Sequence, residues 1–294
     1  MTKDTEVQDR SETADAPAPR LARAFNEEET RYMTGDREPV TSSVLISNSK
    51  YLNSPLYRDA FSQFALRRQG HDVPTTYLVP LMVKAITDVT DFKDYIALVA
   101  EERQKNAEFA AWLDGRRTYK YELAGLGGYK PGTLGAAVRT FLEGSGMNID
   151  FAMKGEVTSD FDYLKQCQSM SHDLEHMVTG FGPNQFGEVA LGICNNTVNA
   201  NYFSPKLAAY ISSSSMFLST TSYPRVSLHY PQAMPGYFEA MRQGITAGQK
   251  LRKPLFMVRW EDYLDWSLAD IAAELGIERG PGEAWAYSTE LTMG

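Results

Sequence analysis

Apolar residues recur at helical spacing along most of this chain, and glycines, prolines and capping residues separate the stretches that carry them. Between residues 92 and 115 the apolar positions include Tyr95, Val99, Phe109 and Trp112, set among charged residues. This pattern is typical of an amphipathic helix. It is not accompanied by a regular alternation of strands with helices, which would indicate a parallel sheet. We therefore expect an all-α, compact multi-helix domain.

Further helices are marked by residues that favour helix starts and stops. These signals predict helices from Thr133 to Gly144, from Ser159 or Asp160 to Gly180, from Asn184 onward, from about Gly236 toward Leu251, and from Ser267 to Gly276. The short apolar run 254–260 is expected to be extended. The stretch 201–234 is rich in serine, which is a poor helix former, so its helix ends stay open.

The two ends of the chain differ from its middle. Residues 1–40 are rich in Asp, Glu, Thr, Arg and Pro and hold few large apolar residues, so we expect a disordered tail there. Residues 279–294 show no periodicity and are expected to form a C-terminal tail. One helical domain is therefore expected over residues 41–278.

Charge and hydropathy argue against two kinds of partner. A formal net charge of -8 leaves no basic surface to neutralise phosphates, so nucleic acid is not expected to bind. No stretch approaches the roughly 18 consecutive apolar residues of a membrane span. The first twenty residues lack an apolar signal core and carry acids that do not suit a mitochondrial transit peptide. We therefore expect a cytoplasmic protein.

Two of the four histidines could hold a metal ion. His172 and His176 lie one helical turn apart, so their imidazoles can converge on one point. Asp173 lies three positions before His176, and Glu188 comes from the next helix. Two nitrogen and two oxygen donors suit Zn²⁺, and also Fe²⁺, Mn²⁺ or Co²⁺. The same spacing is compatible with two solvated surface histidines that have Asp173 and Glu175 as polar partners.

A longer run around these histidines resembles a known family. The run SHDLEHMVTGFGPNQFGE, from Ser171 to Glu188, is similar to the signature of the coenzyme Q biosynthesis protein 4 family, His-Asp-x-x-His followed after eleven residues by Glu. Residues 129–148 resemble the family's Pro-Glu-Gly-Ser-Leu-Gly helix start, and residues 251–278 resemble its closing segment. In that helix start, Lys130 and Pro131 stand where Pro and Glu are usual, and Thr133 replaces the Ser.

The resemblance covers roughly residues 73–278 and implies more than the spacing does. It implies a mainly helical fold, a role in ubiquinone biosynthesis, and one divalent metal ion held by His172, Asp173, His176 and Glu188. It also implies an apolar pocket for an isoprenoid or quinone tail. The candidates for that pocket are large apolar side chains that could equally belong to the core: Phe141, Phe186, Phe203, Met216 and Phe217.

Two functions are compatible with this resemblance. Members have been regarded as scaffolds that present a polyprenylated precursor to the other enzymes of ubiquinone biosynthesis, or as enzymes that replace the C1 carboxylate of a 4-hydroxybenzoate-derived ring by oxygen. In the enzyme hypothesis, the metal binds the ring carboxylate or phenolate, and Glu175 is the candidate for proton handling. Because such a precursor is held in a bilayer, we expect peripheral contact with the inner membrane face. Whether the chain forms a homo-oligomer stays open.

Overall fold

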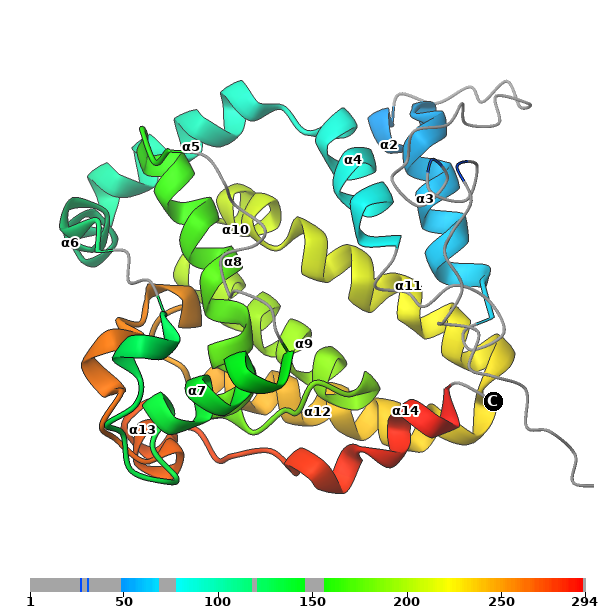
Figure 1. Cartoon of the computed structure of the whole chain (residues 1–294). Helices are drawn as coiled ribbons and strands as arrows, with labels where there is room; N and C mark the ends of the chain where they lie inside the picture. The colour runs from blue at the N-terminus through cyan, green and yellow to red at the C-terminus, as the bar shows by residue number, and fades with distance from the viewer. Residues whose placement is uncertain are drawn as a thin grey trace, which may run out of the picture.

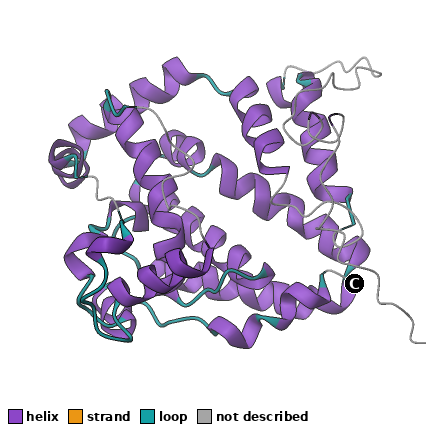
Figure 2. Cartoon of the chain, in the orientation of Figure 1, coloured by secondary structure: helices purple, strands orange, loops and turns teal. Residues whose placement is uncertain are grey.

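The computed structural model of the chain describes Glu27, Arg31 and residues 49–68, 78–117, 121–145 and 156–292. Over these residues it consists of helices and connecting loops, without a strand (Figures 1 and 2). An isolated antiparallel bridge joins Thr133 to Ser267, next to the starts of two helices. The expected all-α fold is therefore confirmed. Of the tail expected over residues 1–40, all but two positions lie outside the described residues.

The described α-helices run from Lys50 to Leu291. In chain order they are α2 (Lys50–Asn53), α3 (Pro55–Leu66), α4 (Val79–Val89), α5 (Phe92–Lys105), α6 (Ala107–Gly115), α7 (Leu134–Ser145), α8 (Asp160–Thr179), α9 (Gln185–Tyr202), α10 (Pro205–Ile211), α11 (Ser213–His229), α12 (Met234–Lys250), α13 (Leu268–Glu274) and α14 (Tyr287–Leu291). Short 3₁₀ helices lie between them: η3 (Leu123–Gly125), η4 (Pro231–Ala233), η5 (Leu255–Met257), η6 (Trp260–Tyr263) and η7 (Gly282–Trp285). None of the described helices is long and apolar enough to cross a bilayer.

Capping residues set the ends of α8 and α9. Ser159 accepts a hydrogen bond from the backbone of Asp162, whose carboxylate accepts one in return, so α8 begins with a capping box. Gly180 ends α8 in the left-handed conformation at φ 69°, where a side chain would be strained. Asn184 caps α9 by accepting from the Gly187 N–H at 2.9 Å. These ends agree with the sequence signals.

The helix predicted from residue 92 to 115 is in fact two helices. Asn106 ends α5, and its side-chain oxygen accepts a hydrogen bond from the backbone N–H of Phe109 at 3.0 Å, which starts α6. Asparagine favours such caps over helix interiors because its side chain competes for backbone groups. The apolar pattern continues across Asn106, so it did not indicate this break.

The expectation of an extended segment over residues 254–260 is wrong. The chain there forms the 3₁₀ helices η5 and η6, and Leu255, Phe256 and Met257 are all buried. An apolar run of this length is equally compatible with a buried helical turn, because it has no measurable period.

The serine-rich stretch, whose helix ends were left open, forms α10 and α11. Some of its hydroxyls donate to backbone carbonyls four residues earlier, as in the bonds from Ser219 to Ser215 at 2.7 Å and from Ser222 to Leu218 at 2.7 Å. These two hydroxyls are thereby satisfied within their own helix.

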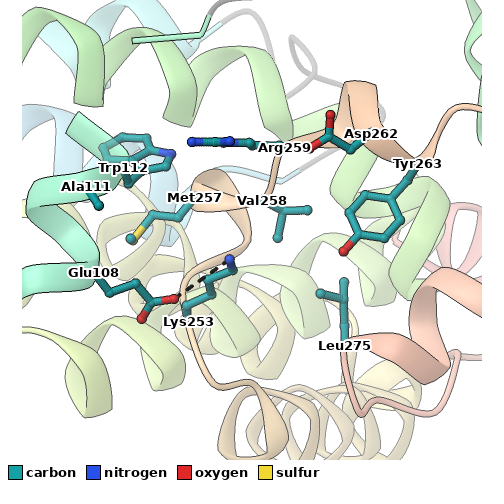
Figure 3. A pocket seen from close by; sticks show the side chains of 10 residues that line it. All are labelled: Glu108, Ala111, Trp112, Lys253, Met257, Val258, Arg259, Asp262, Tyr263 and Leu275. Atoms are coloured by element: carbon teal, nitrogen blue, oxygen red, sulfur yellow. Dashed lines mark ion pairs between the residues drawn. The ribbon is translucent and has the colours of Figure 1, made fainter. Parts of the chain in front are cut away.

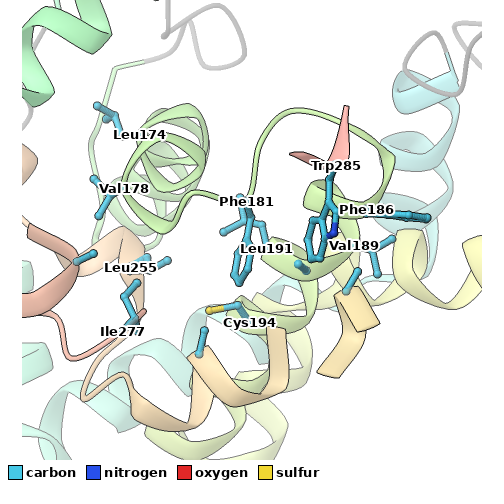
Figure 4. Packing of buried hydrophobic residues seen from close by; sticks show 14 of the residues in the cluster. Leu174, Val178, Phe181, Phe186, Val189, Leu191, Cys194, Leu255, Ile277 and Trp285 are labelled. Atoms are coloured by element: carbon cyan, nitrogen blue, oxygen red, sulfur yellow. The ribbon is translucent and has the colours of Figure 1, made fainter. Parts of the chain in front are cut away.

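The main core is built around α9, and α12 packs closely along it (Figure 1). Glycines permit this approach: a Cβ added at Gly244 would lie 2.3 Å from the carbonyl oxygen of Ala190, and one at Gly248 would lie 2.5 Å from that of Cys194. Figure 4 shows part of this core, in which Phe181 lies near the middle.

The C-terminal segment is packed against α9 and is not an irregular tail. Residues 282–291 form η7 and α14, and Trp285 stacks on Phe181 with 6.3 Å between ring centroids. The Ser288 hydroxyl, which is fully buried, accepts from the Phe186 N–H at 3.2 Å and donates to the cap residue Asn184. The last part of the chain therefore holds the start of α9 in place.

Candidate metal centre

Two consecutive helices bring three of the four predicted metal ligands together. His172 and His176 on α8 have ring centroids 4.7 Å apart, and Glu188 lies in the first turn of α9. Nε2 of His176 lies 3.3 Å from Oε1 of Glu188, and Nε2 of His172 lies 3.7 Å from Oε2 of the same carboxylate. One ligand atom from each residue lies within 4.8 Å of the other two.

A tight turn makes this convergence possible. A Cβ added at Gly187 would lie 1.8 Å from the carbonyl oxygen of Gly182, so only glycine lets the first turn of α9 pack against the loop that follows α8. Glu188 follows directly and faces the two histidines.

His176 is oriented in the way that metal-binding histidines usually are. Its Nδ1 lies 2.5 Å from the carbonyl oxygen of Phe181, to which it donates because a carbonyl can only accept. In the neutral ring the lone pair then belongs to Nε2, which is the usual arrangement in metal sites. The side chain is 6% exposed, and Nε2 is buried without a hydrogen-bond partner. This lone pair is available to a metal ion.

His172 lies at the open side of the cluster, with half of its side chain exposed, and so does Glu188. Asp173 does not join the three converging residues. Its Oδ1 lies 3.6 Å from Nδ1 of His172, on the other side of that ring. Consecutive helix residues project about 100° apart, which places Asp173 beside His172.

The charges of the cluster are coupled. Burial lowers the pKa of His172, but Asp173, Glu188 and Glu175 outweigh that effect and raise it to about 9. Burial raises the pKa of Glu188, but His176 and His172 outweigh it and hold the pKa below its ordinary value. A metal ion at this cluster would therefore have to compete with a proton on His172.

Glu175 is buried, with 3% of its surface exposed, so it is not the solvated helix residue of the alternative interpretation. The Ser171 hydroxyl donates to its Oε1 at 2.6 Å, and the Asn195 side-chain amide on α9 donates to its Oε2 at 2.7 Å. Sequence reasoning missed Asn195, because an asparagine within an amphipathic helix is more often on the surface.

Residues 116–281, more than half of the chain, match the coenzyme Q (ubiquinone) biosynthesis protein Coq4 family. The chain belongs to this family. Coq4 membership implies involvement in ubiquinone biosynthesis. The matched residues contain α8, α9 and the whole His–Glu cluster. No curated protein matches the chain.

A solved structure shares the Coq4 chain's fold. It is the crystal structure, at 2.85 Å resolution, of a protein from Nostoc punctiforme PCC 73102 that is named as a candidate ubiquinone biosynthesis protein. The similarity has a TM-score of 0.52 at 21% identity, and it covers 74% of this chain and 95% of the Nostoc protein.

The five side chains proposed for a lipid pocket do not lie together in this Coq4 chain. Phe186 is fully buried in the main core, and Phe141 packs against that core. Phe203 belongs to a second core around α5, α6 and α10. Only Met216 and Phe217 line the same cavity, about 490 Å³ in volume, between α2, α3, α4, α10 and α11. Large aromatic residues fill cores first, which is why these positions were ambiguous.

A smaller cavity of about 300 Å³ lies between α6 and the segment that leads into α13 (Figure 3). Its rim carries charges of both signs, with Lys253 Nζ 3.8 Å from Glu108 Oε1. Neither this cavity nor the larger one is lined by His172, His176 or Glu188.

Proposed function

We propose that this chain is a metal-dependent enzyme of ubiquinone biosynthesis. It would act on a polyprenylated, 4-hydroxybenzoate-derived precursor and replace the C1 carboxylate of the ring by a hydroxyl group. The observation that carries the proposal is the buried Nε2 of His176, which lies 3.3 Å from Oε1 of Glu188 and next to His172, while Phe181 holds the other nitrogen of the ring. Membership of the Coq4 family supports a role in ubiquinone biosynthesis. The convergence of His172, His176 and Glu188 supports a bound metal ion.

In this proposal His172, His176 and Glu188 hold one divalent ion. Asp173 is either a fourth ligand, as the family resemblance implies, or the acceptor that orients His172 through its second ring nitrogen. Imidazole and carboxylate donors suit Zn²⁺ best, and Fe²⁺, Mn²⁺ or Co²⁺ are also compatible. When bound, the ion would supply positive charge for the carboxylate or phenolate of the ring.

The side chains themselves determine how substrate reaches the cluster. The exposed halves of His172 and Glu188 leave one side of the cluster open to a ring. His176 cannot turn away, because Phe181 holds its other nitrogen. A ring would approach the cluster from the side that His172 and Glu188 form.

The overall reaction is a two-electron oxidation of the ring. In balanced form, ring–COOH, O₂ and H₂O give ring–OH, CO₂ and H₂O₂. The bond between the ring and its carboxyl carbon breaks, a ring–oxygen bond forms, and dioxygen receives the two electrons. Because Zn²⁺ cannot change its oxidation state, a zinc-loaded protein would require the electron-rich ring to reduce dioxygen itself.

A non-catalytic scaffold is the second candidate function. The position of both cavities away from His176 favours it, because a lipid bound there would be presented elsewhere than at the cluster. Under either function, we propose that the chain contacts the inner membrane face peripherally and meets other enzymes of the pathway there, since a polyprenyl chain stays in the bilayer.

The two candidates are separated by one experiment. Purified protein is stripped of metal and reloaded with Zn²⁺, Fe²⁺, Mn²⁺ or Co²⁺. It is then given a short-tailed 3-polyprenyl-4-hydroxybenzoate with a labelled carboxyl group in air. We expect labelled CO₂ and a hydroxylated ring with at least one metal. If none of the four metals supports turnover, the enzyme hypothesis is contradicted and the scaffold hypothesis is retained.

Two histidine variants make the assay specific. His176→Ala is expected to lower turnover by at least about 100-fold, because it removes a ligand from the cluster. His229→Ala is the matched control, since this half-buried histidine at the end of α11 contacts the Leu66 carbonyl and is not part of the cluster.

A further inference from the structure

Two rows of side chains run in parallel along α8. His172 and His176 form one row and meet Glu188, and Ser171 and Glu175 form the next row, one residue earlier. The second row meets α9 as well, through the Asn195 amide that donates to Glu175 at 2.7 Å. Glu175 thus lies beside the metal candidates without facing them, because neighbouring helix positions project about 100° apart.

Glu175 is a carboxyl group buried inside the protein. Among the described residues, no lysine or arginine forms an ion pair with it, and its two hydrogen-bond partners, Ser171 and Asn195, are neutral donors. Neutral hydrogen bonds offset only part of the cost of removing a carboxylate from water. A positive charge nearby would offset the rest.

We propose that Glu175 strengthens the binding of a divalent metal ion to His172, His176 and Glu188 through its negative charge, without coordinating the ion. This inference rests on the proposed metal centre. A divalent ion held by two neutral imidazoles and one carboxylate keeps a net positive charge, and a buried carboxylate beside His176 stabilises that charge in surroundings of low dielectric. Glu175 is therefore a positioning residue, which acts through charge.

Asn195 determines where this charge lies. Its amide binds Glu175 Oε2, and it stands seven positions after Glu188 on α9, two helical turns further along the same face. The hydrogen bond therefore joins the helix of the histidines to the helix of Glu188 at a second point. It keeps the carboxylate inside the protein, where its charge is poorly screened.

Two substitutions at one position separate charge from shape. Glu175→Gln removes the charge but keeps both hydrogen bonds, because an amide can accept from Asn195 and donate to Ser171. Glu175→Asp keeps the charge but shortens the side chain. Binding of Zn²⁺ and Mn²⁺ alone is measured by competition with a chromogenic chelator. We expect Glu175→Gln to weaken binding about tenfold or more, and Glu175→Asp to weaken it less.

A merely structural role predicts the opposite order, with Glu175→Gln binding like the unaltered protein and Glu175→Asp binding worse, and that result would overturn the inference. Thermal unfolding of the metal-free proteins supplies a second readout. Glu175→Gln should be at least as stable as the unaltered chain, because a buried charge has been removed, so a variant that cannot fold also counts against the inference. If the unaltered protein binds no metal, both this inference and the proposed function fail. If Glu175→Gln and the unaltered protein bind the metal ions with equal affinity, this inference alone is overturned.

Discussion

At the scale of single residues, the helical spacing of His172 and His176 was enough to predict that they converge with Glu188, and the structure brings these three together. The spacing was not enough to place Asp173, because a carboxylate next to a histidine ligand can turn either toward the metal or toward the second ring nitrogen of that histidine. Nor could it reveal Glu175 and Asn195 as partners, since that contact depends on which face of α9 packs against α8. Local periodicity does not carry that information.

The role of Asp173 leads to a prediction. Because its carboxylate lies beside Nδ1 of His172 and not among the converging atoms, we expect Asp173→Ala to weaken Zn²⁺ binding about tenfold, as loss of an orienting partner usually does. His176→Ala should abolish stoichiometric binding. Metal content after gel filtration and a chelator titration measure both. If the two variants lose metal to the same degree, Asp173 is a direct ligand.

At the scale of secondary-structure elements, the ends of α8 are among the features that sequence signals predict best, because a capping box requires particular residues at fixed spacing. The break at Asn106 and the turns over residues 254–260 were missed. Neither interrupts the apolar pattern on which the prediction depended.

The capping box of α8 makes stability depend on pH. Hydrogen bonds from Thr158 and Ser159 hold the pKa of Asp162 below its ordinary value. A carboxylate whose folded-state pKa is lowered stabilises the fold above its ordinary pKa of about 4, and the effect disappears as pH falls through the lowered value. We expect the stability advantage of the unaltered protein over Asp162→Asn to be full above about pH 5 and to shrink below about pH 4 in urea unfolding. A difference independent of pH would contradict this.

The contact between α9 and α12 gives a second prediction for an element. Gly244→Ala would place a methyl group against the backbone of Ala190, at 2.3 Å before any shift, so we expect a loss of about 1–3 kcal/mol in the free energy of unfolding. Gly144, on α7, has nothing within 4 Å of an added Cβ. The matched change Gly144→Ala should leave stability unchanged or raise it by up to about 1 kcal/mol. Equal effects of the two changes, measured by chemical denaturation, would show that the helices can separate freely.

At the scale of the whole molecule, the C-terminal segment was the least predictable part, because its helices are short and lack periodicity. Its burial depends on tertiary partners, Phe181 and Asn184, that lie about a hundred residues earlier. These contacts join the end of the chain to the turn between α8 and α9, and thereby to the candidate metal centre. The stability of the last segment and the affinity for metal should therefore change together.

Trp285 tests that coupling. It is 6% exposed and packs against Phe181 and Phe186, on either side of the turn that leads to Glu188. We expect Trp285→Ala to lower the free energy of unfolding by about 3–5 kcal/mol and to weaken Zn²⁺ binding, because Glu188 would be held less firmly.

Trp266→Ala is the control, since this side chain is 43% exposed and lies against Tyr263. Saturating Zn²⁺ should raise the unfolding midpoint of Trp285→Ala, because a ligand that binds only the folded state stabilises it. A loss of stability with unchanged metal affinity would show that the end of the chain supports the core but not the metal centre.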